Sequence, residues 1–322
     1  MKKIMRILRR GIIIIFSILI IIIIISFINH KIKLNQESEL FKPLGKMVKV
    51  NDHYMHVYTE GEGNVTLVFM SGGGTCSPTL DFRSLYSKLS DDYGIAVIEK
   101  AGYGFSEVSD VPRDIDTVLE ETRKALTLAG QKPPYVVFPH SMSGIEAIYW
   151  VNKYPEEVKA IIGLDPAIPE TYENYLMPNK AILNLAAFAA EIGFTRFIPS
   201  VCESSAAIKA GSLTEDEKEI YRAVFYRRTV TKTMLNELEC IKESAEKVDE
   251  MGLPEVPMLL FISNGNGTGW EKEQWQQYLI DYASGIAENQ KIILDCGHYV
   301  HDYEYEEIAS RSKEFLNNII LD

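Results

Sequence analysis

Cysteine is scarce in this chain of 322 residues, and no two cysteines are spaced as Cys-x-x-Cys. That absence leaves zinc-ribbon and thioredoxin-like sites without support. The glycine-rich stretch at residues 71–75 is not followed by Gly-Lys-Ser or Gly-Lys-Thr, which disfavours a phosphate-binding loop. We therefore predict neither a metal site nor a cofactor. An exported domain can pair an even set of cysteines, but the spacing fixes no pairing and free thiols fit equally well; the set is Cys76, Cys202, Cys240 and Cys296.

Acidic residues are absent from the first 33 positions, which carry seven lysines and arginines. Residues 12–28 are apolar except for Ser17 and Ser26, and this run approaches the roughly 20 residues that cross a bilayer. The basic residues before it predict a cytoplasmic N-terminus. A cleaved signal peptide is the alternative, but no small-x-small cleavage site follows the run. We expect residues 1–30 to be an uncleaved signal anchor of a single-pass cell-membrane protein, with the remaining domain outside.

The rest of the chain is strongly acidic. Of the formal net charge of −12, the 289 residues after position 33 hold −19. Such a domain repels nucleic acid and anionic lipid headgroups, so no nucleic-acid partner is expected. Beyond a linker predicted at residues 31–45, residues 46–322 suffice for one well-buried domain. Nothing in the sequence indicates the oligomeric state.

One serine falls between a predicted strand and a predicted helix. Residues 135–138 are short, apolar and β-rich, whereas residues 144–151 carry apolar side chains at helical spacing. Ser141 therefore lies on a sharp strand-to-helix turn that exposes its hydroxyl beside the amides opening the helix. The usual motif is Gly-x-Ser-x-Gly, but here Pro139 and Ser143 replace the two glycines. An ordinary turn with an idle serine is the alternative.

A nucleophilic serine also needs amide donors for the oxyanion that forms during acyl transfer. Residues 65–70 have the pattern of a buried strand that runs into the glycine-rich loop. We expect the amide of Gly73 or Gly74 to act with the amide of Met142 as an oxyanion hole. A flexible turn without this role is the alternative.

The predicted general base lies near the C-terminus, after a last strand at about residues 291–295. His298 follows a glycine and precedes a helical stretch, which places it at the same sheet edge as Ser141. His301 is the second candidate. A metal site that joins these histidines to Asp295 and Asp302 is conceivable, but no other segment of the chain has residues at the spacing of metal ligands. His140 is expected to be a packed neighbour of the serine.

The acid that orients the base has two candidates. The loop after the late strand at residues 257–262 contains no carboxylate, and Asn266 is its strongest candidate. An asparagine can hold a histidine tautomer but cannot stabilise an imidazolium with a full charge. The strand at residues 158–164 ends instead in Asp165. We predict that Asp165 orients His298, the alternatives being Asn266 or an aspartate that only caps a turn.

Strands and helices alternate along most of the chain, which predicts a mostly parallel sheet with helices on both faces and an early antiparallel hairpin at one edge. Between the strands predicted at residues 158–164 and 257–262 the β pattern disappears, so we expect a helical cap at about residues 168–254. Helices are predicted at about residues 80–90, 115–129, 180–191, 215–226, 233–250, 271–286 and 304–320. Apolar cap residues line an acyl pocket or pack on the core, and they include Leu183, Leu185, Phe188, Ile192, Phe194 and Phe197.

Taken together, these motifs resemble the α/β-hydrolase superfamily over residues 46–321. The resemblance rests on the oxyanion loop at residues 71–74, Gly-Tyr-Gly-Phe-Ser at 102–106, the elbow at 140–144 and Gly-His at 297–298. It implies an α/β-hydrolase fold. The stretch around Asp165 is similar to the acid-bearing segment of pancreatic-type lipases. A serine rather than an aspartate at position 141 argues against the epoxide hydrolase and dehalogenase branches.

We therefore expect a membrane-anchored serine hydrolase that cleaves carboxylic esters through an acyl-enzyme on Ser141, with a small-molecule acyl substrate. A peptidase similar to proline iminopeptidases is the first alternative. It requires an acidic patch for the substrate amine, for which Glu203, Glu170 and Glu173 are candidates. The second alternative is a catalytically silent hydrolase scaffold that acts as a binding protein.

Overall fold

The computed structural model describes residues 2–320 and is built on one eight-stranded sheet. The strand order is β1-β2-β4-β3-β5-β6-β7-β8, in which β2 is antiparallel to both of its neighbours and the other pairs are parallel. The predicted sheet, with its hairpin at one edge, is thus confirmed. The strands are β1 (Lys46–Val50), β2 (His53–Glu60), β3 (Thr66–Met70), β4 (Gly94–Glu99), β5 (Tyr135–Ser141), β6 (Val158–Pro166), β7 (Met258–Ile262) and β8 (Asn289–Ile293).

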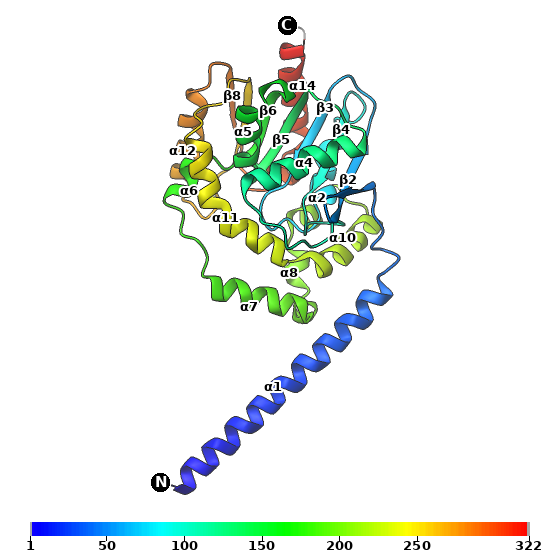
Figure 1. Cartoon of the computed structure of the whole chain (residues 1–322), viewed down its shortest axis with the longest axis vertical. Coiled ribbons are helices and arrows are strands. Elements are labelled where there is room, and N and C mark those ends of the chain that lie inside the picture. The colour runs from blue at the N-terminus through cyan, green and yellow to red at the C-terminus, as the bar shows by residue number, and fades with distance from the viewer. Residues whose placement is uncertain (1, 321–322) are drawn as a thin grey trace.

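Helices cover both faces of this sheet (Figure 1). One face packs against α4 (Ile115–Ala129), α5 (Ser143–Lys153) and α12 (Lys272–Ser284). The other face packs against α3 (Arg83–Tyr86) and α14 (Tyr305–Ile320). Short helices complete the layers: α2 (Pro78–Asp81), η1 (Pro155–Glu157) and α13 (Val300–Tyr303).

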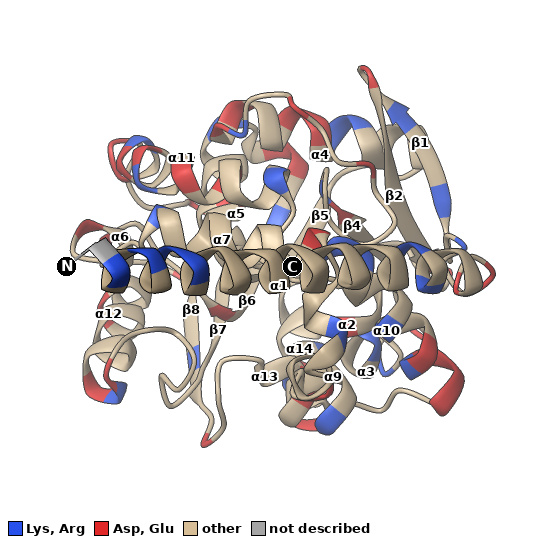
Figure 2. Ribbon diagram, turned by 90° about the horizontal axis from the view of Figure 1, so that it is seen from below, with Lys and Arg blue, Asp and Glu red and all other residues tan. Residues whose placement is uncertain are grey.

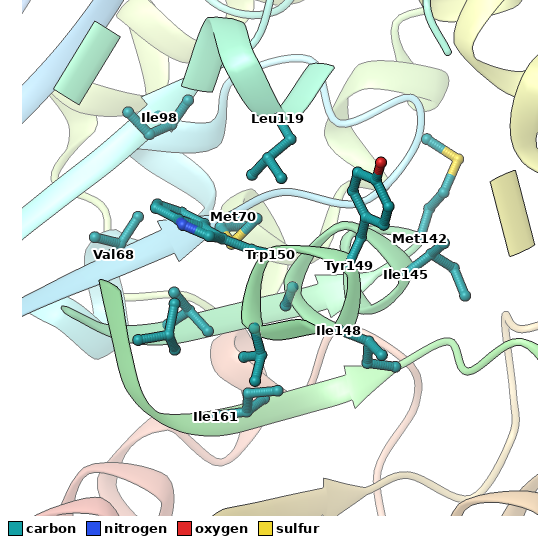
Figure 3. Packing of buried hydrophobic residues seen from close by; sticks show 14 of the residues in the cluster. Val68, Met70, Ile98, Leu119, Met142, Ile145, Ile148, Tyr149, Trp150 and Ile161 are labelled. Carbon is teal, nitrogen blue, oxygen red and sulfur yellow. The ribbon is translucent and has the colours of Figure 1, made fainter. Parts of the chain in front are cut away.

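The core explains why the central strands are continuous apolar runs. In β5, the six residues before Ser141 are buried, because helices cover both faces of the strand. Trp150 and Ile148 of α5 pack against the sheet, near Val68 and Ile161 of the neighbouring strands (Figure 3). This packing fixes α5, and with it the turn that carries Ser141.

Six helices and a 3-10 turn lie between β6 and β7, inside the range expected for the cap. They form a layer beyond the sheet edge at which β5 ends (Figure 1). Asn179, Thr214 and Thr231 cap the N-termini of the three longest helices by accepting a backbone N–H. The elements are α6 (Glu170–Glu173), α7 (Lys180–Glu191), η2 (Phe194–Phe197), α8 (Ser200–Glu203), α9 (Ala206–Lys209), α10 (Glu215–Arg228) and α11 (Lys232–Asp249).

The first helix, α1 (Lys2–Gln36), is long and apolar enough to cross a membrane. Basic residues occupy its first turns, and a long stretch without charge follows (Figure 2). It continues to Gln36, so the first part of the predicted linker at 31–45 is helical. The reason is tertiary contact: Arg196 of the cap makes a two-pronged ion pair with Glu37, with N–O distances of 2.7 Å. The predicted linker is thus helical up to Gln36 and is joined to the cap at Glu37.

Candidate active site

Ser141 is the last residue of β5 and has a positive φ of 54°. This left-handed backbone is rare for a residue with a side chain and is typical of a strained nucleophile turn. The neighbouring glycines leave no room for side chains. A Cβ on Gly72 would lie 2.6 Å from the Cβ of Ser141, and a Cβ on Gly144 would lie 2.1 Å from the carbonyl oxygen of Ala167. Strand, loop and helix thus meet closely around the serine.

The two departures from the Gly-x-Ser-x-Gly pattern are accommodated differently. Pro139 pairs with Met70 of the parallel strand β3 and precedes the strained residue, so its fixed φ is tolerated. Ser143 is small enough for the turn and also forms hydrogen bonds there. Its hydroxyl accepts the backbone N–H of His140 at 3.0 Å and lies 2.7 Å from the carbonyl oxygen of Met70, to which it donates. From the sequence, Ser143 is expected only to be small enough for the turn, so these hydrogen bonds were not predicted.

His298 and Asp165 meet beside the serine. Nδ1 of His298 lies 2.6 Å from Oδ2 of Asp165, whose side chain is fully buried. Because Nδ1 is held by Asp165, Nε2 is the ring nitrogen that can accept a proton. Ser141 and His298 line the same cavity, although no hydrogen bond joins the two side chains in the structure. Catalytic hydrogen bonds are often long or poorly aligned in enzymes without bound substrate.

Asp165 is held by two further donors that the sequence analysis did not find. Its Oδ1 accepts the backbone N–H of Ser263 at 2.7 Å and the indole N–H of Trp275 at 2.8 Å. Ser263 follows β7 and Trp275 lies on α12, so three segments distant in sequence converge on one carboxylate. Asp165 itself has a positive φ of 51°. Both carboxylate oxygens therefore have hydrogen-bond partners, which stabilises the buried charge.

The alternative acid and base lie elsewhere. The side chain of Asn266 forms no hydrogen bond with the imidazole; instead its backbone carbonyl accepts the N–H of His298 at 3.0 Å. His301 is buried against Phe82 and His140 and does not line the cavity. Burial lowers the pKa of His301 to about 3, so its imidazole is neutral.

His140, which was expected to be a packed neighbour of the serine, packs against the candidate base. The ring centroids of His140 and His298 are 4.6 Å apart, and Nε2 of His140 lies 3.1 Å from the carbonyl oxygen of His298. Burial keeps the pKa of His140 well below its usual value. A neutral His140 with its proton on Nε2 donates to that carbonyl and supports the loop.

A cavity of about 320 Å³ opens above Ser141 and also contacts His298, Gly73, Gly74 and Met142. Its wall carries no Asp, Glu, Lys or Arg side chain. Of the six apolar cap residues proposed for this wall, only Leu183 lines it. Leu185, Phe188, Phe194 and Phe197 are instead exposed on the surface. Other apolar residues of the wall include Tyr172, Val230, Met234, Leu235 and Leu238.

The three glutamates proposed to bind a substrate amine do not reach this cavity. Glu203 pairs with Arg222 at 2.7 Å, outside the pocket. Glu170 and Glu173 are exposed on α6. The acidic patch expected for an aminopeptidase is therefore not formed by these residues.

Among residues 2–320, no three His, Cys, Asp or Glu side chains gather in a way that holds a metal ion. The conceivable site of Asp295, His298, His301 and Asp302 is thus not assembled. All four cysteines are free thiols, and Cys76, Cys202 and Cys296 are buried. Burial raises the pKa of Cys296 to about 12, which keeps this thiol protonated and unreactive.

Comparison with known proteins identifies the family of the chain. A family model for the alpha/beta hydrolase fold matches residues 65–305. The uncharacterized protein YbdG of Bacillus subtilis is 37% identical over 99% of this chain and 100% of its own length. The solved structure of lip1 from Acinetobacter baumannii covers 91% of this chain and 97% of its own, with 15% identity and a TM-score of 0.67. A serine hydrolase involved in carbazole degradation covers 84% of this chain and 98% of its own, with 15% identity and a TM-score of 0.61. The chain therefore belongs to the α/β-hydrolase family.

Proposed function

We propose that this α/β hydrolase is a serine hydrolase that cleaves uncharged carboxylic esters through an acyl-enzyme on Ser141. The observation that carries the proposal is the contact between His298 and Asp165 beside a strained serine, at the floor of an uncharged cavity. A carboxylate on one ring nitrogen fixes the tautomer in which the other accepts a proton. The serine hydrolase involved in carbazole degradation has the same fold as this chain, and this supports a proposal of serine-based hydrolysis on the α/β-hydrolase fold.

In the proposed reaction, Oγ of Ser141 attacks the ester carbonyl carbon while Nε2 of His298 takes the hydroxyl proton. The amide of Met142 and that of Gly73 or Gly74 bind the oxyanion of the tetrahedral intermediate. The intermediate collapses as the imidazolium gives its proton to the leaving alcohol. Water, deprotonated by His298, then attacks the acyl-enzyme and releases the carboxylic acid. Asp165 stabilises the imidazolium in both steps.

The charge of the cavity separates ester hydrolysis from aminopeptidase activity. A protonated substrate amine buried in a cavity without a carboxylate loses its hydration with no compensating ion pair. An acyl chain gains from the same apolar wall. The proposal therefore favours uncharged acyl substrates over peptides with a free N-terminus.

We also propose that α1 is an uncleaved signal anchor that holds the domain outside the cell membrane. The basic start of α1 and the missing cleavage site support this orientation. Protease treatment of intact cells tests it, because the domain is then digested while the cytoplasmic end is protected. A fully protected domain overturns the orientation.

Substrate class is tested with the purified full-length chain. We expect hydrolysis of p-nitrophenyl esters with a preference for chains longer than acetyl, and no turnover of proline or alanine arylamides. In Ser141→Ala, ester hydrolysis falls by on the order of 10³-fold or more. Faster turnover of an arylamide than of any ester contradicts the proposed substrate class.

A further inference from the structure

Helix α7 of the cap is apolar but not buried. Nine of its twelve residues are alanine, leucine, isoleucine or phenylalanine, yet none of the twelve is buried in the domain. A helix that is apolar all round normally lies in a protein core or against lipid. Here one part of the helix faces the catalytic cavity, because Leu183 lines it. The outward side chains are Ile182, Leu185 and Phe188, which are 67%, 66% and 45% exposed.

The exposed apolar surface continues beyond α7. Phe194 and Phe197 of η2 are 41% and 55% exposed, and Ile198 and Val201 follow at 44% and 46%. Only three of the 27 residues from 176 to 202 are charged, although the domain as a whole is strongly acidic. We refer to Ile182, Leu185, Phe188, Phe194, Phe197, Ile198 and Val201 as the cap apolar face. Contiguous apolar surface of this kind marks an interaction site.

The position of α1 indicates what covers this face. The hydroxyl of Ser26, near the end of the apolar run, donates to the carbonyl of Ile192 at 2.8 Å. One turn later, Nδ1 of His30 accepts from Arg196 at 2.9 Å, and Arg196 also binds Glu37. The segment after α7 is therefore fixed to α1 where its apolar run ends. The cap lies on the side of the domain that faces α1 (Figure 1).

We propose that the cap apolar face lies in the surface of the lipid bilayer that α1 crosses. If α1 spans the membrane, its contacts at Ser26 and His30 bring this face to the level at which lipid gives way to water. Apolar helices at that level bury their outer side chains at the boundary between headgroups and acyl chains. Arg196 and Arg227 lie on the water side, where both contact Glu37.

The proposal also gives the substrate a route, and this part rests on the proposed function. Helix α7 separates the outer apolar face from the cavity, with Leu183 on the cavity side and Leu185 on the lipid side. A lipophilic ester dissolved in the bilayer then reaches Ser141 by passing α7, without crossing water. The substrate class is accordingly an ester that partitions into membranes.

Quenching by brominated lipid tests the contact without any activity measurement. Full-length Leu185→Trp is reconstituted in phosphatidylcholine vesicles with or without bromine on the acyl chains, and the emission of the parent protein is subtracted. The control is Leu128→Trp, since Leu128 is also an exposed leucine (50%) but lies at the end of α4, at the sheet edge opposite the cavity. We expect bromine to quench the added indole at position 185 and not at 128. Equal quenching at both positions overturns the proposal. The proposal is also overturned if a second copy of the chain covers position 185 and shields its indole from the brominated lipid.

The route is tested with two substrates. In Leu185→Asp/Phe188→Asp, hydrolysis of a long-chain ester embedded in vesicles is expected to fall by about tenfold, because two charges resist lipid contact. Hydrolysis of a short, soluble p-nitrophenyl ester is expected to change by less than about twofold. Leu128→Asp leaves both rates unchanged. An equal fall for both esters contradicts the route, whereas an inactive parent protein contradicts the proposed function and leaves the quenching result to stand.

Discussion

Asp165 and His298 are 133 residues apart in sequence, yet Oδ2 of the first lies 2.6 Å from Nδ1 of the second. The parallel sheet produces this contact. Asp165 is the second-last residue of strand β6, and the loop after β8 carries His298 at the same edge. Because the carboxyl ends of parallel strands share one edge, residues from distant segments converge there.

Replacing Asp165 by asparagine tests whether this carboxylate orients the base. The amide cannot stabilise the imidazolium and presents an N–H₂ to Nδ1, which forces the wrong tautomer. We expect kcat for ester hydrolysis to fall by about three to four orders of magnitude in Asp165→Asn. Asn266→Ala is the matched control, since the Asn266 side chain forms no hydrogen bond with the imidazole, and its kcat should stay within about threefold of the parent. The reverse pattern contradicts the assignment.

Trp275 is a positioning residue, because its indole N–H holds Oδ1 of Asp165 at 2.8 Å. Trp275→Phe keeps an aromatic ring but removes the donor. We expect kcat to fall by about tenfold with a smaller change in KM, and stability to fall by about 1–3 kcal/mol. Trp270→Phe, which lines the cavity without touching Asp165, is expected to alter KM more than kcat. A purely structural role predicts loss of stability in Trp275→Phe with kcat unchanged.

Because Gly72 has no side chain, the side chain of Ser141 can lie beside it. In Gly72→Ala the new Cβ would lie 2.6 Å from the Cβ of Ser141 and 3.2 Å from Nδ1 of His140. Relieving this overlap displaces the nucleophile, so we expect loss of activity together with about 1–3 kcal/mol of stability. Gly252→Ala supplies the comparison, because Gly252 has a φ of 81° but a Cβ added there would meet no atom within 4 Å. Its backbone strain costs about 1–2 kcal/mol without affecting kcat.

Asp81 makes stability depend on pH. Burial raises its pKa to about 7, and its Oδ2 is without a hydrogen-bond partner among the described residues. The unfolded chain releases this proton near pH 4, whereas the folded chain retains it until about pH 7. Stability therefore falls as pH rises between these values. Asp81→Asn removes this loss, so its thermal unfolding temperature should exceed that of the parent at pH 7 by more than at pH 4.5. An equal difference at both pH values contradicts the assignment.

Much of the fold follows from local patterns. The apolar runs predicted the central strands, and the disappearance of the β pattern after Pro166 predicted the cap. Ser141, His298 and Asp165 were proposed because a nucleophile turn, a Gly-His loop and a strand-end carboxylate each carry a short signature. The structure brings these three residues to one edge of the sheet.

The rest depends on contacts that no local pattern reveals. Trp275 and Ser263 hold Asp165 only because α12 and the end of β7 pack beside β6. The helical residues 31–36 were predicted as linker, since their polar composition does not show that Glu37 pairs with Arg196. Likewise, apolar side chains of α7 were expected to face the pocket or the core, and composition alone does not separate these from a lipid-facing surface.

The most direct test of the account is covalent labelling of the full-length protein by a fluorophosphonate, followed by mass spectrometry of the labelled peptide. The account predicts a single adduct on Ser141 that is absent from Ser141→Ala and strongly slowed in Asp165→Asn. The same absence of labelling in the parent protein and in Ser141→Ala would contradict it.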